Sequence, residues 1–124
     1  MKLIIFSDID GTFMNHYDYS YKVLKKTVSN IKKNHELIFN SSKTFAEINV
    51  LSKDLGIRFP FIAENGACIF FPDDYFDKIS FSKSFFRHKN YIGYSLSKKK
   101  KNYWDEIIKE IRKKFNLIFF FLEN

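Results

Sequence analysis

The strongest constraint on the fold is a short apolar segment that ends in two carboxylates. Residues 4–12 read IIFSDIDGT, so Asp8 and Asp10 stand one residue apart directly after a run of strand-forming side chains. The Gly11 turn lets both carboxylates project from the carboxyl edge of the strand, where open α/β sheets place their ligands. Two neighbouring anions are costly to bury unless a cation or a shared proton relieves them. The pattern predicts a site for a hard cation such as Mg2+. An acidic turn would account for Asp10-Gly11 alone.

Strand and helix patterns alternate after this segment. We expect strands over 2–7, 36–40 and 61–63, and we expect the first of them to be buried. Helices are expected between them, over 20–34 and over 44–55. The first is indicated by apolar residues at helical spacing, Val23, Leu24, Val28 and Ile31. The second is indicated by the capping-box spacing of Thr44 and Glu47 and by a terminal Gly56. The alternation predicts an α/β fold with a parallel sheet.

The pattern changes after Ala63. Asn65-Gly66 between two apolar runs favours a hairpin, and 72–74 favour another turn. Residues 75–90 show no clear periodicity. The rest of the chain predicts a strand over 91–96, a helix over about 102–115 and a last strand over 117–122.

Composition excludes several classes of function. The net charge of +7 is spread evenly, with nine basic and six acidic residues in the first 62 positions and twelve and eight in the last 62. This lacks the basic stripe that follows a nucleic-acid backbone, so we expect no nucleic-acid partner. Cys68 is the only cysteine, which rules out an intramolecular disulfide. No signal peptide or membrane span is recognisable, so we expect no membrane association and a cytoplasmic location.

The Asp8-x-Asp10-Gly11-Thr12 pattern resembles the first signature of the haloacid dehalogenase superfamily of phosphotransferases. The resemblance implies a Rossmann-like parallel sheet in a three-layer α/β/α arrangement. It implies that Asp8 is the nucleophile that forms an aspartyl-phosphate. Asp10 would protonate the leaving group and then activate water. Both carboxylates would bind Mg2+, and Thr12 would contact the phosphate.

A second resemblance lies at the end of the second expected strand. The superfamily places a Ser or Thr there that hydrogen-bonds the phosphoryl group, and the matching position is Ser41, with Ser42 beside it as a rival. Lys43 adds a cation near the same edge, suited to a phosphate or carboxylate of the substrate. A plain loop before a helix N-cap would also explain the two serines.

The runs Ser41–Thr44 (SSKT), 46–48 (AEI), 60–62 (PFI) and 64–67 (ENGA) are similar to the mannosyl-3-phosphoglycerate phosphatases. More general sugar phosphatases carry Thr-Gly-Arg at the first run. The likeness implies a type IIB-like cap after the third strand. It also implies a Mg2+-dependent phosphomonoesterase for a phosphorylated sugar-acid such as mannosyl-3-phosphoglycerate. Glu64, Asn65 and Gly66 would face the substrate, although a purely structural hairpin is an equal alternative for Glu64.

The resemblance extends only to about Pro72. Family members are roughly twice as long and carry a third-signature Lys and a fourth Gly-Asp…Asp signature that holds Mg2+; no run after Pro72 matches the latter. We therefore expect an incomplete hydrolase core over 1–72 and a partial α+β cap over 73–124, as in a truncated or split phosphatase. Asp73 and Asp74 are the first suspects for any further metal ligands.

Such a half-core predicts partners beyond the small phosphorylated substrate. The third strand's edge and one apolar face would lack cover, and Ile69, Phe70 and Phe71 would lack packing partners. We expect self-association or a complementing C-terminal fragment. The alternative function is a non-catalytic remnant or interaction module whose exposed edge pairs with another chain. If the gene encodes a continuation of this chain with a Gly-Asp…Asp signature, the phosphatase is favoured over the interaction module.

Overall fold

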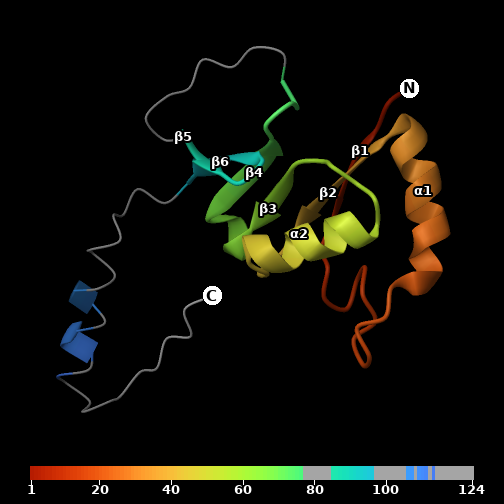
Figure 1. Ribbon diagram of the computed structural model, residues 1–124. Helices are drawn as coiled ribbons and strands as arrows, with labels where there is room; N and C mark the ends of the chain where they lie inside the picture. Colours follow the sequence, from red (N-terminus) through yellow and green to blue (C-terminus); the bar gives the residue numbers. More distant parts are fainter. Residues whose placement is uncertain (77–84, 97–105, 108, 112, 114–124) are drawn as a thin grey trace.

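The computed structural model describes residues 1–76, 85–96, 106–107, 109–111 and 113. Within these residues six strands form one mixed sheet in the order β1-β2-β3-β4-β6-β5 (Figure 1). The strands are β1 (Ile4–Ser7), β2 (Glu36–Asn40), β3 (Phe61–Ala63), β4 (Cys68–Pro72), β5 (Phe85–His88) and β6 (Tyr91–Ser95). The predicted α/β fold is confirmed: β1, β2 and β3 run parallel, and the later strands add antiparallel pairs.

The helix between β1 and β2 begins later than predicted. A 3-10 turn, η1 (Lys22–Leu24), precedes α1 (Lys25–Asn34), because no side chain caps the N-terminus and the first turn holds no acidic residue. The tighter winding of the 3-10 turn rotates Val23 outward, and Val23 is 86% exposed. Its predicted place on the buried face was wrong.

The helix between β2 and β3 follows its sequence signals. α2 (Phe45–Asp54) opens with a complete capping box, in which the Thr44 side chain accepts from the Glu47 amide and Glu47 accepts from the Thr44 amide. It ends at Leu55 as C-cap, and Gly56 follows with φ +62°. Both ends of the element were therefore predictable from local chemistry.

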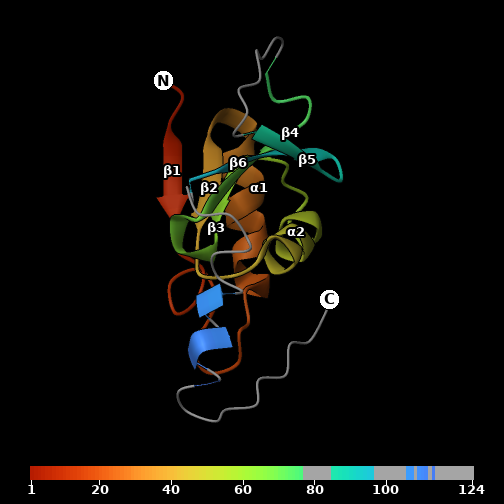
Figure 2. The same cartoon turned by 90° about the vertical axis from the view of Figure 1, so that its left-hand side faces the viewer.

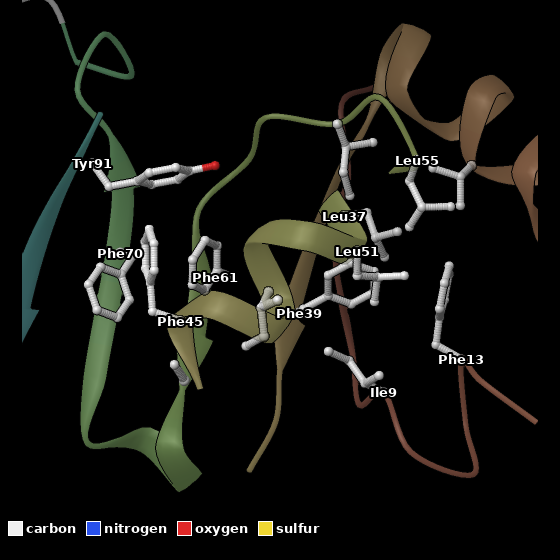
Figure 3. Packing of buried hydrophobic residues seen from close by; sticks show 14 residues of the cluster. Ile9, Phe13, Leu37, Phe39, Phe45, Leu51, Leu55, Phe61, Phe70 and Tyr91 are labelled. Atoms are coloured by element: carbon white, nitrogen blue, oxygen red, sulfur yellow. The ribbon is translucent and has the colours of Figure 1, made fainter. Parts of the chain in front are cut away.

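The core lies between the sheet and the two helices, and Figure 3 shows it as two neighbouring groups. Around α2 and the loop after β1, apolar side chains such as Ile9, Phe13, Phe39 and Leu51 pack together. The second group is aromatic: Phe45 at the start of α2 contacts Phe70 and Tyr91, with ring centroids 4.8 and 5.4 Å apart. This group ties β4 and β6 to the same helix that follows β2. The described residues thus supply two layers of the expected three, a sheet and one helical layer.

The two edge strands of the described sheet are β1 and β5, and the edge beside the parallel strands lies at β1. Among the described strands β1 pairs only with β2 and stands at the margin of the sheet (Figure 2). Its side chains alternate between half-buried and exposed, with Ile4 57% and Phe6 63% exposed. The prediction of a buried first strand was therefore wrong, because a strand with one covered face leaves every second side chain exposed.

The predicted open edge at the third strand was also wrong. The chain turns back after Ala63, and β4 pairs antiparallel with β3, aligning Phe61 with Phe70. Phe70 is 5% exposed, so the expectation that it would lack packing partners fails with the edge. The hairpin predicted at Asn65-Gly66 is the connection that produces this pairing.

The remaining predictions are met in part. The strand predicted over 91–96 is β6, and the described residues between 106 and 113 have helical backbone within the predicted helix. The strand predicted over 117–122 lies outside the described residues. Because β5 and β6 continue the same sheet as β4, the division at residue 72 stays a prediction. No helix in the described part of the chain is long and apolar enough to cross a membrane.

A buried carboxylate fastens the end of the sheet where β2 begins. Glu36 is 6% exposed; it contacts the Lys2 ammonium and accepts a 2.5 Å hydrogen bond from the Tyr75 hydroxyl. The Lys2 donor and then the Tyr75 donor hold the pKa of Glu36 below its usual value. Burial, followed by the Glu36 carboxylate, raises the pKa of Tyr75 to about 12. This cluster joins the N-terminus, β2 and the turn after β4.

Candidate active site

A polar cleft lies where the three parallel strands end. Its volume is about 480 Å3, and it is lined by Asp8, Asp10, Asn40, Ser41, Ser42 and Asn65. Asp8 follows β1, Ser41 follows β2 and Asn65 follows β3. The carboxyl edge of the sheet therefore collects side chains that are far apart in sequence, as the strand pattern predicted.

The loop after β1 presents both carboxylates on one side. Ile9 between them is fully buried, and its carbonyl accepts the amides of Phe13 and Met14 at 3.0 and 2.7 Å. Gly11 makes the turn possible with φ +73°, a conformation that costs a Cβ-bearing residue about 1–2 kcal/mol. Because Ile9 points into the core, Asp8 and Asp10 on either side of it line the cleft.

Main-chain hydrogen bonds join the other two loops. The Asn65 amide donates to the Ser41 carbonyl at 3.1 Å, and the Glu64 amide donates to the Lys43 carbonyl at 3.0 Å. Ser41 itself is 4% exposed, and its hydroxyl oxygen accepts the Lys43 amide at 3.2 Å. The loop after β2 and the loop after β3 are thus held as one unit beside the carboxylates.

Three consecutive residues of that unit have left-handed backbone. Glu64 and Asn65 both have φ 54°, and Gly66 has φ 87°. Glycine and asparagine adopt this region readily, whereas glutamate does so at a cost. Strain of this kind concentrates at functional sites, and here it lies in the loop that carries Asn65 into the cleft.

Lys43 is bound to Asp10. Its ammonium lies 3.0 Å from Asp10 Oδ1 and 3.8 Å from Glu47 Oε1, and the Tyr19 ring centroid is 5.9 Å away. The Asp10 carboxylate raises the pKa of Lys43 above its usual value, although burial opposes the shift. The contact is an ion pair without hydrogen-bond alignment, and Asp10 Oδ1 is buried with no hydrogen-bond partner.

The cleft gathers some of the predicted residues and not others. Asp8, Asp10, Ser41 and Asn65 line it, together with Ser42, the rival of Ser41. Thr12 and Glu64 are exposed and, with Gly66 and Lys43, are not among its lining residues. Their predicted roles stay predictions. Sequence reasoning missed Asn40, whose only signal is its place as the last residue of β2.

The donor set fits a divalent cation held by two carboxylates. Asp8 and Asp10 line the same cleft, and Asp10 Oδ1, which contacts the Lys43 ammonium but accepts no hydrogen bond, is the kind of oxygen that Mg2+ accepts as a ligand. No group of three or more His, Cys, Asp or Glu that could hold a metal occurs among the described residues. Asp73 and Asp74 are paired with Arg58 at 2.6 and 3.1 Å and do not line the cleft.

Comparison with known proteins connects this geometry to a family. Residues 5–91 match the profile of the haloacid dehalogenase-like hydrolases. Over 74 residues the chain is 47% identical to a glucosyl-3-phosphoglycerate/mannosyl-3-phosphoglycerate phosphatase of Persephonella marina, covering 59% of this chain and 28% of the relative. It is 40% identical over 74 residues to a mannosyl-3-phosphoglycerate phosphatase of Pyrococcus furiosus, covering 59% and 30%. The match thus spans less than a third of either relative.

The fold has a counterpart among solved structures. A hypothetical protein of Geobacillus kaustophilus HTA426 aligns with a TM-score of 0.57 at 18% identity, over 93% of this chain and 37% of that protein. At this level of identity the likeness speaks for the fold alone.

Proposed function

The chain belongs to the haloacid dehalogenase-like hydrolase family, and on that premise we propose that it takes part in Mg2+-dependent hydrolysis of a phosphomonoester through an aspartyl-phosphate. One observation carries the proposal: Asp8, Asp10 and Ser41 come from separate loops and line a single cleft at the carboxyl edge of the sheet. A structural turn would not require all three to converge.

The reaction follows from the chemistry of these groups. A carboxylate oxygen of Asp8 attacks phosphorus, and the ester oxygen leaves with a proton supplied by Asp10. Asp10, now a carboxylate, takes a proton from water, which attacks the aspartyl-phosphate. Inorganic phosphate leaves and the Asp8 carboxylate is restored. Two easier transfers replace one difficult transfer, and Asp10 serves both.

Other residues bind the phosphoryl group and the metal. The Ser41 hydroxyl, Thr12 and Lys43 supply donors for the phosphoryl oxygens, where donors fixed before the reaction lower the barrier most. Asp8 and Asp10 would hold Mg2+, which supplies positive charge to offset the charge on phosphate. Without such a cation, the Asp8 and Asp10 carboxylates would repel the negatively charged phosphate.

The substrate that we propose is a phosphorylated sugar-acid such as mannosyl-3-phosphoglycerate. Support comes from the two relatives described above, which are named as phosphatases of this kind of compound. Glu64, Asn65 and Gly66 would contact it from the loop after β3, of which Asn65 lines the cleft. We assign 1–72 to the hydrolase core and 73–124 to a partial cap, and we place the reaction in the cytoplasm. A complementing C-terminal fragment would supply the third- and fourth-signature residues.

A single-turnover experiment tests the proposal. The chain is mixed with Mg2+ and mannosyl-3-phosphoglycerate labelled in its phosphate, and acid-stable label on the protein is measured. We expect label that hydroxylamine releases, as for an acyl phosphate, and none in Asp8→Asn, whose amide is nearly isosteric but cannot attack phosphorus. Asp18→Asn is the matched control, because Asp18 is exposed and lies outside the cleft. Equal label in Asp8→Asn would overturn the aspartyl-phosphate.

One observation favours a second candidate function. The open edge of β1 carries the exposed Ile4 and Phe6, which suit a chain that pairs with another polypeptide. As an interaction module, the chain would bind its partner equally well after Asp8→Asn. A split phosphatase would also keep its partner after Asp8→Asn while losing phosphoryl transfer. The labelling experiment on the wild-type protein therefore decides between the two functions, because only a phosphatase takes up label.

A further inference from the structure

A second cavity adjoins the cleft on the far side of Lys43. It measures about 400 Å3 and lies between the loop after β1 and helix α2, lined by Met14, Tyr21, Lys43, Ala46, Glu47, Val50 and Leu51. The Lys43 ammonium is 3.0 Å from Asp10 Oδ1, and Asp10 lines the phosphate cleft. The Asp10–Lys43 ion pair is therefore the boundary shared by the two cavities.

One wall of this cavity is apolar and fixed in place. Met14 and Leu51 pack with the core, and Val50 on α2 is 66% exposed. The Tyr21 hydroxyl donates a hydrogen bond to the Asp54 carboxylate, which holds the ring in place. The same hydrogen bond raises the pKa of Tyr21. Asp54 in turn is paired with Lys25 at 2.8 Å. An aromatic ring tethered between the start of α1 and the end of α2 forms a surface for the C–H face of a ligand.

The other wall presents a donor and an acceptor side by side. Glu47 Oε2 accepts from the amide and hydroxyl of Thr44 at 2.9 and 2.8 Å, so the capping box fixes the carboxylate. Its other oxygen, Oε1, lies 3.8 Å from the Lys43 ammonium. Neighbouring hydroxyl groups suit this pair, because each hydroxyl both donates and accepts a hydrogen bond. An apolar ligand would take water away from the Lys43 ammonium and the Glu47 carboxylate without offering either a hydrogen bond, and a purely anionic ligand would be repelled by Glu47.

We propose that this cavity binds the polyhydroxylated, glycosyl part of the substrate's leaving group. The inference rests on the proposed function, in which Asp10 gives its proton to the leaving oxygen. The leaving group then departs on the Asp10 side of the phosphate, which is the side where Lys43 and the cavity lie. Lys43 and Glu47 hydrogen-bond its hydroxyls, and Tyr21 contacts its apolar face. The subsite would discriminate a glycosylated phosphoglycerate from phosphoglycerate itself.

Calorimetry on the full chain with Mg2+ tests the subsite without turnover. The probes are inorganic phosphate, 3-phosphoglycerate and mannosyl-3-phosphoglycerate, used with protein in which Asp8→Asn prevents hydrolysis. We expect the glycosylated ester to bind about tenfold more tightly than 3-phosphoglycerate, the equivalent of roughly one net hydrogen bond. Ala46→Trp, which fills the cavity from an exposed position on α2, should abolish this difference and leave 3-phosphoglycerate binding unchanged.

Two further variants keep the test decisive. Lys53→Trp places the same ring on α2 outside the cavity and should preserve the tenfold difference. Val50→Trp fills the cavity from a second exposed position if Ala46→Trp does not fold. Equal affinities for the two esters in the parent protein, or a difference that survives both cavity-filling variants, would overturn the subsite and leave the proposed function standing. Failure of phosphate and both esters to bind would overturn the proposed function and the subsite together.

Discussion

Asp8 and Asp10 are two positions apart in the chain but have different surroundings. Asp8 is exposed, whereas Asp10 keeps one oxygen buried against the Lys43 ammonium. The buried Ile9 sets this arrangement, because it fixes the loop between them. A reaction in which one carboxylate attacks and the other carries a proton requires such a difference in environment. The different roles proposed for Asp8 and Asp10 therefore follow from the way the buried Ile9 places them.

Replacing Asp8 should also reveal the strength of the metal site. Mg2+ is usually bound by one or two carboxylates together with waters, and only two carboxylates line the cleft among the described residues. We expect a dissociation constant on the order of millimolar by calorimetry, and weaker binding in Asp8→Asn, because an amide oxygen is a poorer ligand for Mg2+ than a carboxylate. Asp18→Asn should bind as the parent does. A micromolar constant would mean that further ligands complete the site.

The left-handed backbone of Glu64 leads to a stability prediction. Its Cβ costs about 1–2 kcal/mol in this conformation, and the added freedom of glycine in the unfolded chain offsets about 0.5–1 kcal/mol. Glu64→Gly should therefore raise the free energy of unfolding, measured in urea, by up to about 1.5 kcal/mol. Asn65→Gly should change it less, because asparagine tolerates φ 54° better. A loss of stability in Glu64→Gly would show that its side chain has a structural role.

Among the elements, β2 depends on the Lys2–Glu36–Tyr75 cluster at its start. Tyr75→Phe removes the hydroxyl that donates to a buried carboxylate and should lower the free energy of unfolding near pH 7 by about 1–3 kcal/mol. Tyr17→Phe is the control, because Tyr17 is 92% exposed.

The difference between parent and Tyr75→Phe should depend on pH in two directions. The pKa of Glu36 is lowered from 4.5, so its contribution is present above pH 4.5 and is lost as pH falls through the lowered value. The pKa of Tyr75 is raised from 10.0 to about 12, so its contribution is present below pH 10 and is lost as pH rises toward 12. Urea denaturation across this range should show a plateau that falls at both ends. A difference independent of pH would contradict the cluster.

The elements also show which features a sequence can reveal. The capping box at Thr44 and Glu47 was predictable because all its atoms lie within four residues. The outward turn of Val23 was not, since no side chain signals a 3-10 start. Nor was the Lys43–Asp10 ion pair, which joins loops 33 positions apart. The convergence of Asp8 and Ser41 was predictable, because parallel strands end at one edge.

The open edge at β1 is a property of the whole molecule. The chain turns back after Ala63, so β4 covers the edge of β3, while in the described part of the sheet the edge of β1 stays open. The apolar composition of the strands does not predict which of them pair. Edge strands with large exposed apolar side chains promote association, and β1 carries Ile4 and Phe6. We expect the chain to self-associate in gel filtration with light scattering, and Phe6→Lys to shift it toward the monomer.

A matched variant separates edge pairing from a general effect of charge. Val23→Lys adds the same charge at an 86% exposed site on the helical side and should not alter the oligomeric state. We also expect poor phosphatase activity from the isolated chain, because no lysine is among the described residues that line the cleft, and one oxyanion donor is worth about 2.7–4 kcal/mol. A monomer that turns over at ~1–1000 per second would contradict both expectations.

The main-chain bonds between the loops after β2 and β3 bear on how such a site can evolve. Amides and carbonyls of Ser41, Lys43, Glu64 and Asn65 hold the loops together, and every amino acid except proline supplies these groups. Side chains at neighbouring positions such as Ser42 can therefore be exchanged without dismantling the frame. Selection for a new ligand would act on the lining of the cleft while the frame that shapes it is inherited unchanged.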